Sequence, residues 1–292
     1  MEKIKIALGR TSISRLFLTN ENSPLNLVHQ PVTPIHLAFR PMVEEMAFDV
    51  SELAIVTAIQ AVEQKRKIVP LPITISARIQ HKCIIQNGEF TNFTPTDLEG
   101  KRVAVRAFSQ TTGAWVRTIL DTEYGVDCTK IEWITQEAPH VAGAPEPSFV
   151  KRDPSGASPL DLIRQGAVDA AIFGNDLPDE PWVKPIIANP DKAGRASLDK
   201  TGIIQINHII AVSRPFFEQR QSDVKMIMQG FSSARHQLSK SEQRMLPAGQ
   251  EEMQKSVEKL IGSLLRQGLI SRNLTFQDIF GDGMKLYETL PL

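Results

Sequence analysis

The sequence predicts a mixed α/β protein made of two lobes. Short apolar runs of strand length alternate with longer segments of helical pattern, as in a parallel sheet covered by helices. This alternation starts again near Phe90, so the middle of the chain has the size of a smaller α/β lobe. A chain of 292 residues, 41% of them hydrophobic, is long and apolar enough to form two cores.

The first lobe is expected to begin with three strands and a helix. The predicted strands span residues 3–8, 35–39 and 47–50. Ser51 is expected to cap a helix that continues to about Glu63, because a serine hydroxyl accepts a hydrogen bond from the free N–H groups of a first turn. The prolines in the run 68–75 predict an irregular or edge strand.

The second lobe is expected to contain further strands around one long helix. Its predicted strands span residues 102–105, 131–135 and 168–173. The helix is predicted from Thr111 or Thr112 to Tyr124, where Gly125 is a natural residue to end it. The stretch 138–159 is rich in Pro, Gly and Ala and is predicted to be a loop.

Two apolar runs, 81–86 and 205–213, are predicted to carry the chain into and out of the second lobe. Only helices are expected after the second run, among them 251–268, where apolar residues keep an i, i+3, i+4 spacing. The predicted domain boundaries are 1–85 with 209–292 for the first lobe, and 86–208 for the second.

Composition excludes several classes of function. The 33 Lys and Arg residues balance the 33 Asp and Glu residues, so no nucleic-acid partner is expected. No apolar run is long enough to span a bilayer, and the first residues, MEKIKIALGR, lack the apolar region of a secretory signal. Together with only two cysteines, Cys83 and Cys128, this predicts a cytoplasmic protein without a membrane partner. A homo-oligomer is left open.

Polar residues gather at the predicted carboxyl ends of the strands, where open parallel sheets bind ligands. Glu52 lies where a strand passes into a helix, and Thr111 and Thr112 begin the helix that follows another strand. Arginine side chains and helix N-termini both suit a small anionic ligand. The other candidate residues are Arg10, Arg40, Ser51, Arg78, His81, Trp115, Asn175 and His208.

Each candidate also has a purely structural interpretation. A glutamate in a first helical turn complements the helix dipole, and a histidine in an apolar strand is more often a hydrogen-bonded core residue than a catalyst. Trp115 could equally fill the core. The remaining histidines are interpreted as structural or exposed: His29, His36, His140 and His236.

Motifs of other site classes are absent. The sequence contains no GxGxxG after a strand, and no GxxxxGK[ST], HExxH, CxxC or GxSxG. A metal ion held by Glu52, His81 and His208 is conceivable, but these residues lack the sequence spacing of a metal site.

Several segments, in this order, resemble the 4,5-dihydroxyphthalate decarboxylase family. They are FRPMVEEMAFDVSELAI, VPLPITISARIQHKCI, TPTDLEGKRVAVRAFSQTTGAWVRTILDTEYGVD and TGIIQINHIIAVSR. The resemblance covers most of the chain and is weakest over 138–200 and the last helices. It implies the two-lobed fold of type II periplasmic binding proteins, with a ligand cleft between the lobes.

The resemblance also implies a reaction, the non-oxidative loss of CO2 from a hydroxylated aromatic dicarboxylate such as 4,5-dihydroxyphthalate, which gives 3,4-dihydroxybenzoate. On this hypothesis His81 or His208 is the proton donor or the partner of the phenol, and Glu52 orients or deprotonates a hydroxyl. The arginines and threonines would hold carboxylates. No cofactor is expected, although a divalent metal is left open.

The alternative is a solute-binding protein that captures a small carboxylate anion without chemistry. The lack of a signal sequence favours the enzyme, because the receptor of a transporter must reach the cell surface. The two histidine candidates favour it as well, since capture alone needs arginines and backbone donors rather than groups that titrate near neutral pH.

Overall fold

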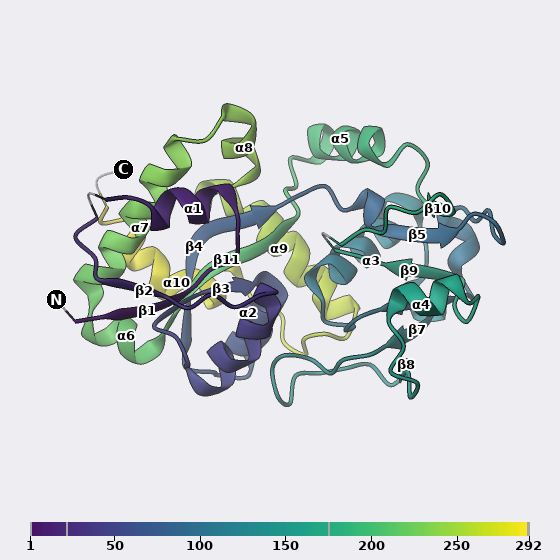
Figure 1. The fold of residues 1–292 in the computed structure, drawn as a ribbon, viewed down its shortest axis with the longest axis horizontal. Coiled ribbons are helices and arrows are strands. Elements are labelled where there is room, and N and C mark those ends of the chain that lie inside the picture. The colour runs from purple at the N-terminus through teal and green to yellow at the C-terminus, as the bar shows by residue number, and fades with distance from the viewer. Residues whose placement is uncertain (1, 22, 175, 291–292) are drawn as a thin grey trace.

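The computed structural model describes residues 2–21, 23–174 and 176–290 and has two α/β lobes. Each lobe is built on its own sheet, and the two lobes lie side by side along the longest axis of the molecule (Figure 1). The helices of the C-terminal part, in green and yellow, cover the sheet of the first lobe, and one of them, α9 (Gly249–Arg266), reaches the second lobe (Figure 1).

The sheet of the first lobe has five strands in the order β2-β1-β3-β11-β4. Their bounds are β1 Ile4–Ala7, β2 Leu27–His29, β3 Val50–Ala54, β4 Ile68–Ala77 and β11 Ile206–Ser213. β1 runs parallel to β2 and β3, whereas β11 runs antiparallel to β3 and β4. The chain therefore returns from the second lobe through β11, which lies next to β3 near the middle of this sheet.

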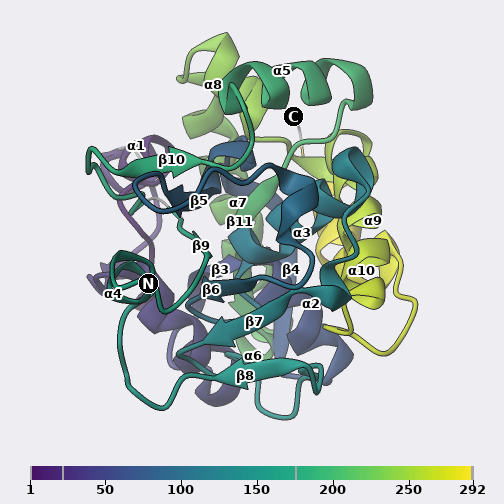
Figure 2. The same ribbon diagram turned by 90° about the vertical axis from the view of Figure 1, so that its right-hand side faces the viewer.

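The sheet of the second lobe has six strands in the order β10-β5-β9-β6-β7-β8. Their bounds are β5 Ile84–Asn87, β6 Arg102–Val105, β7 Glu132–Thr135, β8 Val150–Arg152, β9 Ala170–Ile172 and β10 Val183–Pro185. The strands β9, β6, β7 and β8 run parallel to one another, and β5 is antiparallel to both of its neighbours. Figure 2 views the molecule from the side of this lobe.

The helices follow the sequence patterns closely at several ends. Their bounds are α1 Ser12–Leu18, α2 Ile55–Glu63, α3 Thr111–Tyr124, α4 Pro159–Arg164, α5 Pro190–Thr201, α6 Arg214–Gln219, α7 Gln221–His236, α8 Lys240–Met245 and α10 Phe276–Tyr287. α3 ends where predicted, because Gly125 adopts a left-handed conformation with φ 68°. Its N–H donates to the carbonyls of Leu120 and Asp121 in the last turn. β4 is an edge strand, as its prolines predict.

Three local predictions are wrong. The run 35–39 is not a strand but contains the short 3₁₀ helix Ile35–Ala38, in which Leu37 is exposed while Phe39 after it is buried. An apolar run of this length cannot be assigned from its pattern alone, which explains the error. The predicted loop 138–159 contains the edge strand β8, and the predicted strand 81–86 begins with the 3₁₀ helix His81–Cys83.

The prediction for Ser51 is also wrong. Ser51 does not cap a helix, because β3 continues to Ala54 and α2 begins only at Ile55. The strand is longer than the sequence indicates, since β1 pairs with it on one side and β11 on the other. Glu52 therefore lies inside a central strand and not in the first turn of a helix.

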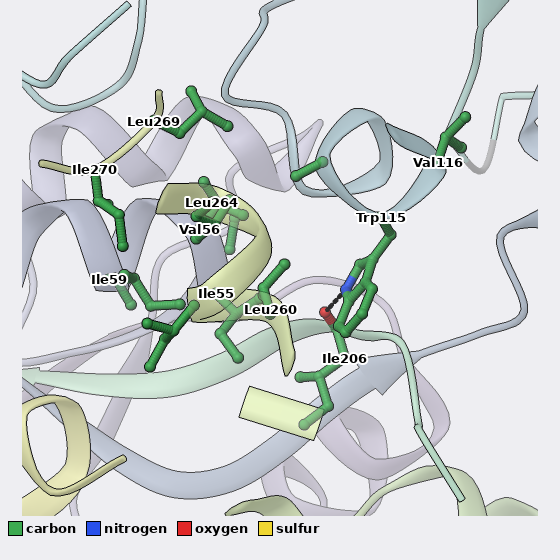
Figure 3. Close-up of a cluster of buried hydrophobic side chains, with 14 of the residues drawn as sticks. Ile55, Val56, Ile59, Trp115, Val116, Ile206, Leu260, Leu264, Leu269 and Ile270 are labelled. Carbon is green, nitrogen blue, oxygen red and sulfur yellow. Dashed lines mark hydrogen bonds between the residues drawn. The ribbon is translucent and has the colours of Figure 1, made fainter. Parts of the chain in front are cut away.

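One hydrophobic cluster continues from the first lobe into the second. Side chains of α2, α3 and α9 meet in it, and the segment after α9 closes one side (Figure 3). Polar bonds reinforce this contact: the hydroxyls of Thr118 and Ser263 lie 2.7 Å apart, and the Gln267 amide donates to the Ala114 carbonyl at 3.0 Å. The lobes are thus joined by packing as well as by the crossing segments.

Among the residues that the structure describes, no helix combines the length and hydrophobicity that crossing a membrane requires.

Candidate functional site

A buried glutamate and a partly exposed histidine form a close pair on neighbouring strands. Glu52 of β3 and His208 of β11 lie two residues apart across the antiparallel pairing, and Glu52 Oε1 is 2.6 Å from His208 Nδ1. The Glu52 side chain is 2% exposed, whereas that of His208 is 21% exposed. The second carboxylate oxygen, Oε2, accepts a hydrogen bond from the backbone N–H of Gly9 at 2.7 Å. Both oxygens of this buried acid are therefore satisfied.

Glycine at position 9 makes this arrangement possible. A Cβ atom at Gly9 would lie 3.0 Å from Glu52 Oε2, closer than side chains normally pack. Without it, the turn after β1 approaches the carboxylate and directs a backbone donor at it. The structural interpretation of Glu52, that it only complements a helix dipole, does not hold, because its carboxylate bonds to His208 and Gly9 from within a strand.

Two further histidines, His36 and His140, lie near this pair, although their sequence context predicts structural or exposed residues. The ring of Phe39 meets His208 edge-on at 5.3 Å between ring centroids and His140 edge-on at 5.5 Å. His36 lies close enough to both histidines for their charges to interact. Burial, helped by the charge of Arg106, lowers the pKa of His36 and of His140 to about 4. Both imidazoles are therefore neutral at neutral pH.

His140 belongs to a short segment of the second lobe that is bound to the first lobe. We call residues 139–142 the strap. Its histidine Nδ1 lies 3.0 Å from the hydroxyl of Thr57 in α2. The carbonyl of Pro139 accepts from Arg40 at 2.8 Å, and the N–H of Ala142 donates to Glu44 at 2.8 Å. The strap therefore brings a ring from the second lobe to the Glu52–His208 pair.

A second cluster forms where α3 begins. Arg78 Nη2 donates to the hydroxyl of Thr112 at 2.9 Å, and Gln110 lies just before the helix. A Cβ atom at Gly174 would lie 3.3 Å from Asp176 Oδ1, 3.5 Å from Arg78 Nη2 and 3.6 Å from Gln110 Nε2, so two donors and one carboxylate, which accepts from the Gly174 N–H, meet at the turn after β9. An arginine and a free helix N-terminus together suit an anionic group. Asn175, predicted to belong here, lies outside the described residues.

The two clusters lie where the lobes meet. The hydroxyl of Thr111, in the first turn of α3, accepts from the N–H of Val56, in the first turn of α2, at 3.4 Å. Asn207, next to His208 in β11, lies 3.5 Å from the hydroxyl of Thr112. From the predicted set, the structure thus places Arg78, Thr111 and Thr112 at the junction of the lobes, and the Glu52–His208 pair lies on β3 and β11, whose residue Asn207 reaches Thr112.

His81 is not part of this group. Its ring is fully buried, and Nε2 lies 2.9 Å from Glu123 Oε2. Glu123 lies near the C-terminal end of α3, roughly 18 Å along the helix axis from Thr111. Ser197 of α5 donates to the other oxygen of Glu123 at 2.7 Å, and both residues line a cavity of about 510 Å³ between α3, α5 and α9. A metal site of Glu52, His81 and His208 is therefore excluded by this geometry.

The remaining candidates lie elsewhere or have structural partners. Arg40 holds the strap, as described above, and Arg10 is exposed directly after Gly9. Ser51 donates to the carbonyl of Glu52 within β3 at 2.7 Å. Trp115 is buried, and its Nε1–H donates to the carbonyl of Ile206 at 2.8 Å (Figure 3). In the part of the chain that the structure describes, no three His, Cys, Asp or Glu residues are arranged to hold a metal ion.

Comparison with curated proteins confirms the family resemblance. The chain is 24% identical over 209 residues to a protein of Comamonas testosteroni named 4,5-dihydroxyphthalate decarboxylase, a match that covers 67% of this chain and 62% of the relative. A protein of the same name from Pseudomonas putida is 22% identical over 157 residues, which are 51% of this chain and 59% of the relative. The matches thus span less than two thirds of either relative. No family model matches the chain.

Comparison with solved structures confirms the two-lobed fold of the periplasmic-binding-protein type. A putative periplasmic sulfonate-binding protein SsuA from Methylobacillus flagellatus superposes with a TM-score of 0.61 at 13% identity, over 99% of this chain and 95% of that one. The Candida albicans CA3427 gene product, described as having the generic periplasmic binding protein fold, gives 0.58 at 10%, over 97% and 94%. The desulfurization enzyme DSZB gives 0.56 at 11%, over 98% and 100%.

Proposed function

We propose that this chain is a decarboxylase of a hydroxylated aromatic dicarboxylate, such as 4,5-dihydroxyphthalate, and that it needs no cofactor. The observation that carries the proposal is the Glu52–His208 pair, in which a buried carboxylate lies 2.6 Å from a partly exposed imidazole beside Phe39. The names of the two curated relatives support the same reaction. A cytoplasmic location is part of the proposal and is supported by the two cysteines, which are both free.

The pair provides what the first step of such a reaction needs. In 4,5-dihydroxyphthalate each carboxylate has a hydroxyl para to it on the ring. His208 accepts the proton of that hydroxyl through Nε2, while Glu52 holds Nδ1–H and stabilises the imidazolium that forms. The phenolate pushes electron density to the ring carbon that carries the carboxylate.

The remaining steps balance without an electron acceptor. A proton from solvent adds to that ring carbon and gives a dienone, and the bond to the carboxylate then breaks. Its electron pair restores the aromatic ring and the phenolate, while the carboxylate leaves as CO2. The proton on His208 returns to the phenolate oxygen. Overall one proton is consumed for each CO2 released, and nothing is oxidised or reduced.

The cluster at the start of α3 is proposed to hold the second carboxylate. Arg78 and the hydroxyl of Thr112 are 2.9 Å apart, and the free N–H groups of the first turn of a 14-residue helix lie beside them. Charge-assisted bonds of this kind fix the orientation of a carboxylate. Orientation matters here, because only the carboxylate para to the deprotonated hydroxyl can leave.

The direct test is to incubate the purified, chelator-treated protein with 4,5-dihydroxyphthalate and to follow CO2 release and ultraviolet absorbance. We expect turnover to 3,4-dihydroxybenzoate, which Glu52→Gln and His208→Ala lower by about 10²-fold or more although both variants remain folded. His236→Ala is the matched control, because the His236 ring bonds, among the described residues, only to the carbonyl of Ser232 in its own helix α7. Turnover by His208→Ala at the rate of the unmodified protein would remove the pair from the mechanism.

The alternative function is capture of a small anion without chemistry. The fold shared with a putative sulfonate-binding protein and the donors at the start of α3 favour it. A thermal shift of the protein with 4,5-dihydroxyphthalate, without any release of CO2, is the result that would replace the proposed decarboxylase by this binding function.

A further inference from the structure

His140 reaches the Glu52–His208 pair from the other lobe and does so in a fixed orientation. The strap that carries it is bound to the first lobe on both sides of the histidine, by Arg40 at Pro139 and by Glu44 at Ala142. Arg66 adds a third bond, from Nη2 to the carbonyl of Ala142 at 2.6 Å. The partners of the strap in these bonds, Arg40, Glu44 and Arg66, all belong to the first lobe. The bonds therefore fix the strap to the first lobe and do not contribute to packing within the second.

The hydroxyl of Thr57 determines which nitrogen of His140 carries the hydrogen. Thr57 is buried, and among the described residues its hydroxyl bonds only to His140 Nδ1, at 3.0 Å. If Nδ1 were the donor, the hydroxyl hydrogen would be left in the interior without an acceptor, which is unfavourable for a buried polar group. The hydroxyl therefore donates to Nδ1, and the hydrogen of the neutral ring is on Nε2.

The aromatic ring of Phe39 relates His140 to His208. Both imidazoles meet this ring edge-on, at angles of 85° and 81° between the ring planes. Each uses Nδ1 for a partner of the first lobe, Thr57 or Glu52, and so keeps Nε2 for a ligand. Among the described residues neither Nε2 has a hydrogen-bond partner, so the Nε2 of His208 is available as an acceptor beside a carboxylate and that of His140 as a neutral donor.

We infer that His140 selects hydroxylated aromatic acids, by donating a hydrogen bond from Nε2–H to the substrate hydroxyl next to the one that His208 deprotonates. This inference rests on the proposed function and narrows the substrate class to acids with two neighbouring ring hydroxyls. A neutral donor is suited to a phenol or phenolate oxygen, because a site built to bond a hydroxyl discriminates strongly against analogues that lack it. The low pKa of His140 keeps this donor uncharged at neutral pH.

The tautomer can be measured without any catalytic assay. Nitrogen NMR of the protein labelled with ¹⁵N-histidine, assigned with His140→Phe, is expected to show Nε2–H for His140. Thr57→Ser is expected to keep this tautomer, whereas Thr57→Val, which has the same shape but no hydroxyl, is expected to lose the preference. A dominant Nδ1–H signal in the unmodified protein would overturn the inference.

The selectivity is measured with matched ligands. His140→Phe, which keeps a ring against Phe39, is expected to lower kcat/KM for 4,5-dihydroxyphthalate about 10²-fold, the usual cost of one lost donor. Binding of phthalate, which has no hydroxyls, is expected to be unchanged, and His140→Gln is expected to recover part of the loss. An equal loss of affinity for both ligands would overturn the inference. If the protein releases no CO2, the same comparison of 3,4-dihydroxybenzoate with benzoate by calorimetry tests it independently.

Discussion

Among the described residues, histidine and glutamate form two close pairs, and the two pairs differ in which partner is buried. In the pair His208–Glu52 the acid is buried, with 2% of its side chain exposed, and the imidazole reaches the surface at 21%. In the pair His81–Glu123 the imidazole is fully buried and the acid is 29% exposed. The distances are similar, 2.6 and 2.9 Å. The two contacts are thus alike in chemistry. They differ in the exposed partner, which is the histidine in the first pair and the glutamate in the second.

The surroundings of each pair fit this difference. Glu52 is held by the backbone of Gly9, and His208 shares Phe39 with another imidazole at the junction of the lobes. His81 lies under α5, where a Cβ atom at Gly194 would be 3.0 Å from its Nδ1. The difference agrees with the proposed function, in which the first pair takes part in the reaction, and with a structural role for the second pair, which attaches α5 to α3.

The largest expected effect tests that assignment through the two acids. Glu52→Gln is expected to lower kcat/KM for 4,5-dihydroxyphthalate by about 10²- to 10⁴-fold, because the imidazole loses the carboxylate that stabilises its charged form. The same change at Glu123 is expected to leave kcat/KM near that of the unmodified protein. Steady-state rates of both variants, with circular dichroism to verify folding, make the comparison. Equal losses in the two variants would contradict the assignment.

The next effect concerns stability. Here the His81–Glu123 pair is expected to matter more than the Glu52–His208 pair. His81→Ala is expected to lower the free energy of unfolding by about 2–4 kcal/mol, because it leaves a cavity and removes the partner of Glu123. Urea unfolding measures this, and the remaining folded protein is expected to keep its kcat. Asp199→Asn in α5 is the control, since the ion pair of Asp199 with Arg244 is exposed and should contribute less than about 1 kcal/mol. A His81→Ala protein as stable as this control would show that the buried pair is not a structural attachment.

The last effect is a change in the slope of stability with pH, and it distinguishes the His36 and His140 region from the His81–Glu123 pair. The pKa of His36 and His140 is about 4 in the folded chain and 6.5 in the unfolded one, so the unfolded chain takes up protons first as the pH falls. Stability that depends on these groups is present above pH 6.5 and is lost between 6.5 and about 4, by at most about 1.4 kcal/mol per pH unit for His140.

Glu123 affects stability at lower pH than the two histidines do. Its hydrogen bonds to His81 and Ser197 overcome the effect of burial and lower its pKa from 4.5, so the stability it provides is lost only below about pH 4.5. Urea unfolding from pH 7 to 4 is expected to show a shallower slope above pH 4.5 in His140→Phe, while Glu123→Gln changes only the lower range. A slope above pH 4.5 that is the same in His140→Phe as in the parent would contradict this division.

Polar residues beside apolar runs make Glu52, His208, Arg78 and Thr112 candidates from the sequence. The structure places Glu52 and His208 inside the neighbouring strands β3 and β11, Arg78 just after β4 and Thr112 in the first turn of α3. The alternation of strands and helices also predicts two lobes, because it starts again near Phe90 after a first set of strands.

The rest depends on contacts between distant parts of the chain. His140 stands in a Pro- and Gly-rich stretch without periodicity, and its neighbours Phe39 and Thr57 belong to the other lobe. His81 was grouped with His208 because both lie near crossing segments. A 3₁₀ turn instead directs its ring towards Glu123, and the sequence carries no local signal for such a turn.

The hydrophobic cluster shared by α2, α3 and α9 has a consequence for engineering. A lobe exchanged with that of another protein of this fold would bring its own α3 against the α9 of this chain, and ridges that evolved apart would not interlock. Whole-lobe chimeras should therefore be harder to make here than in proteins joined by linkers alone. The strap, which is short and bound mainly by polar groups, is the better unit to transplant when a new ligand preference is wanted.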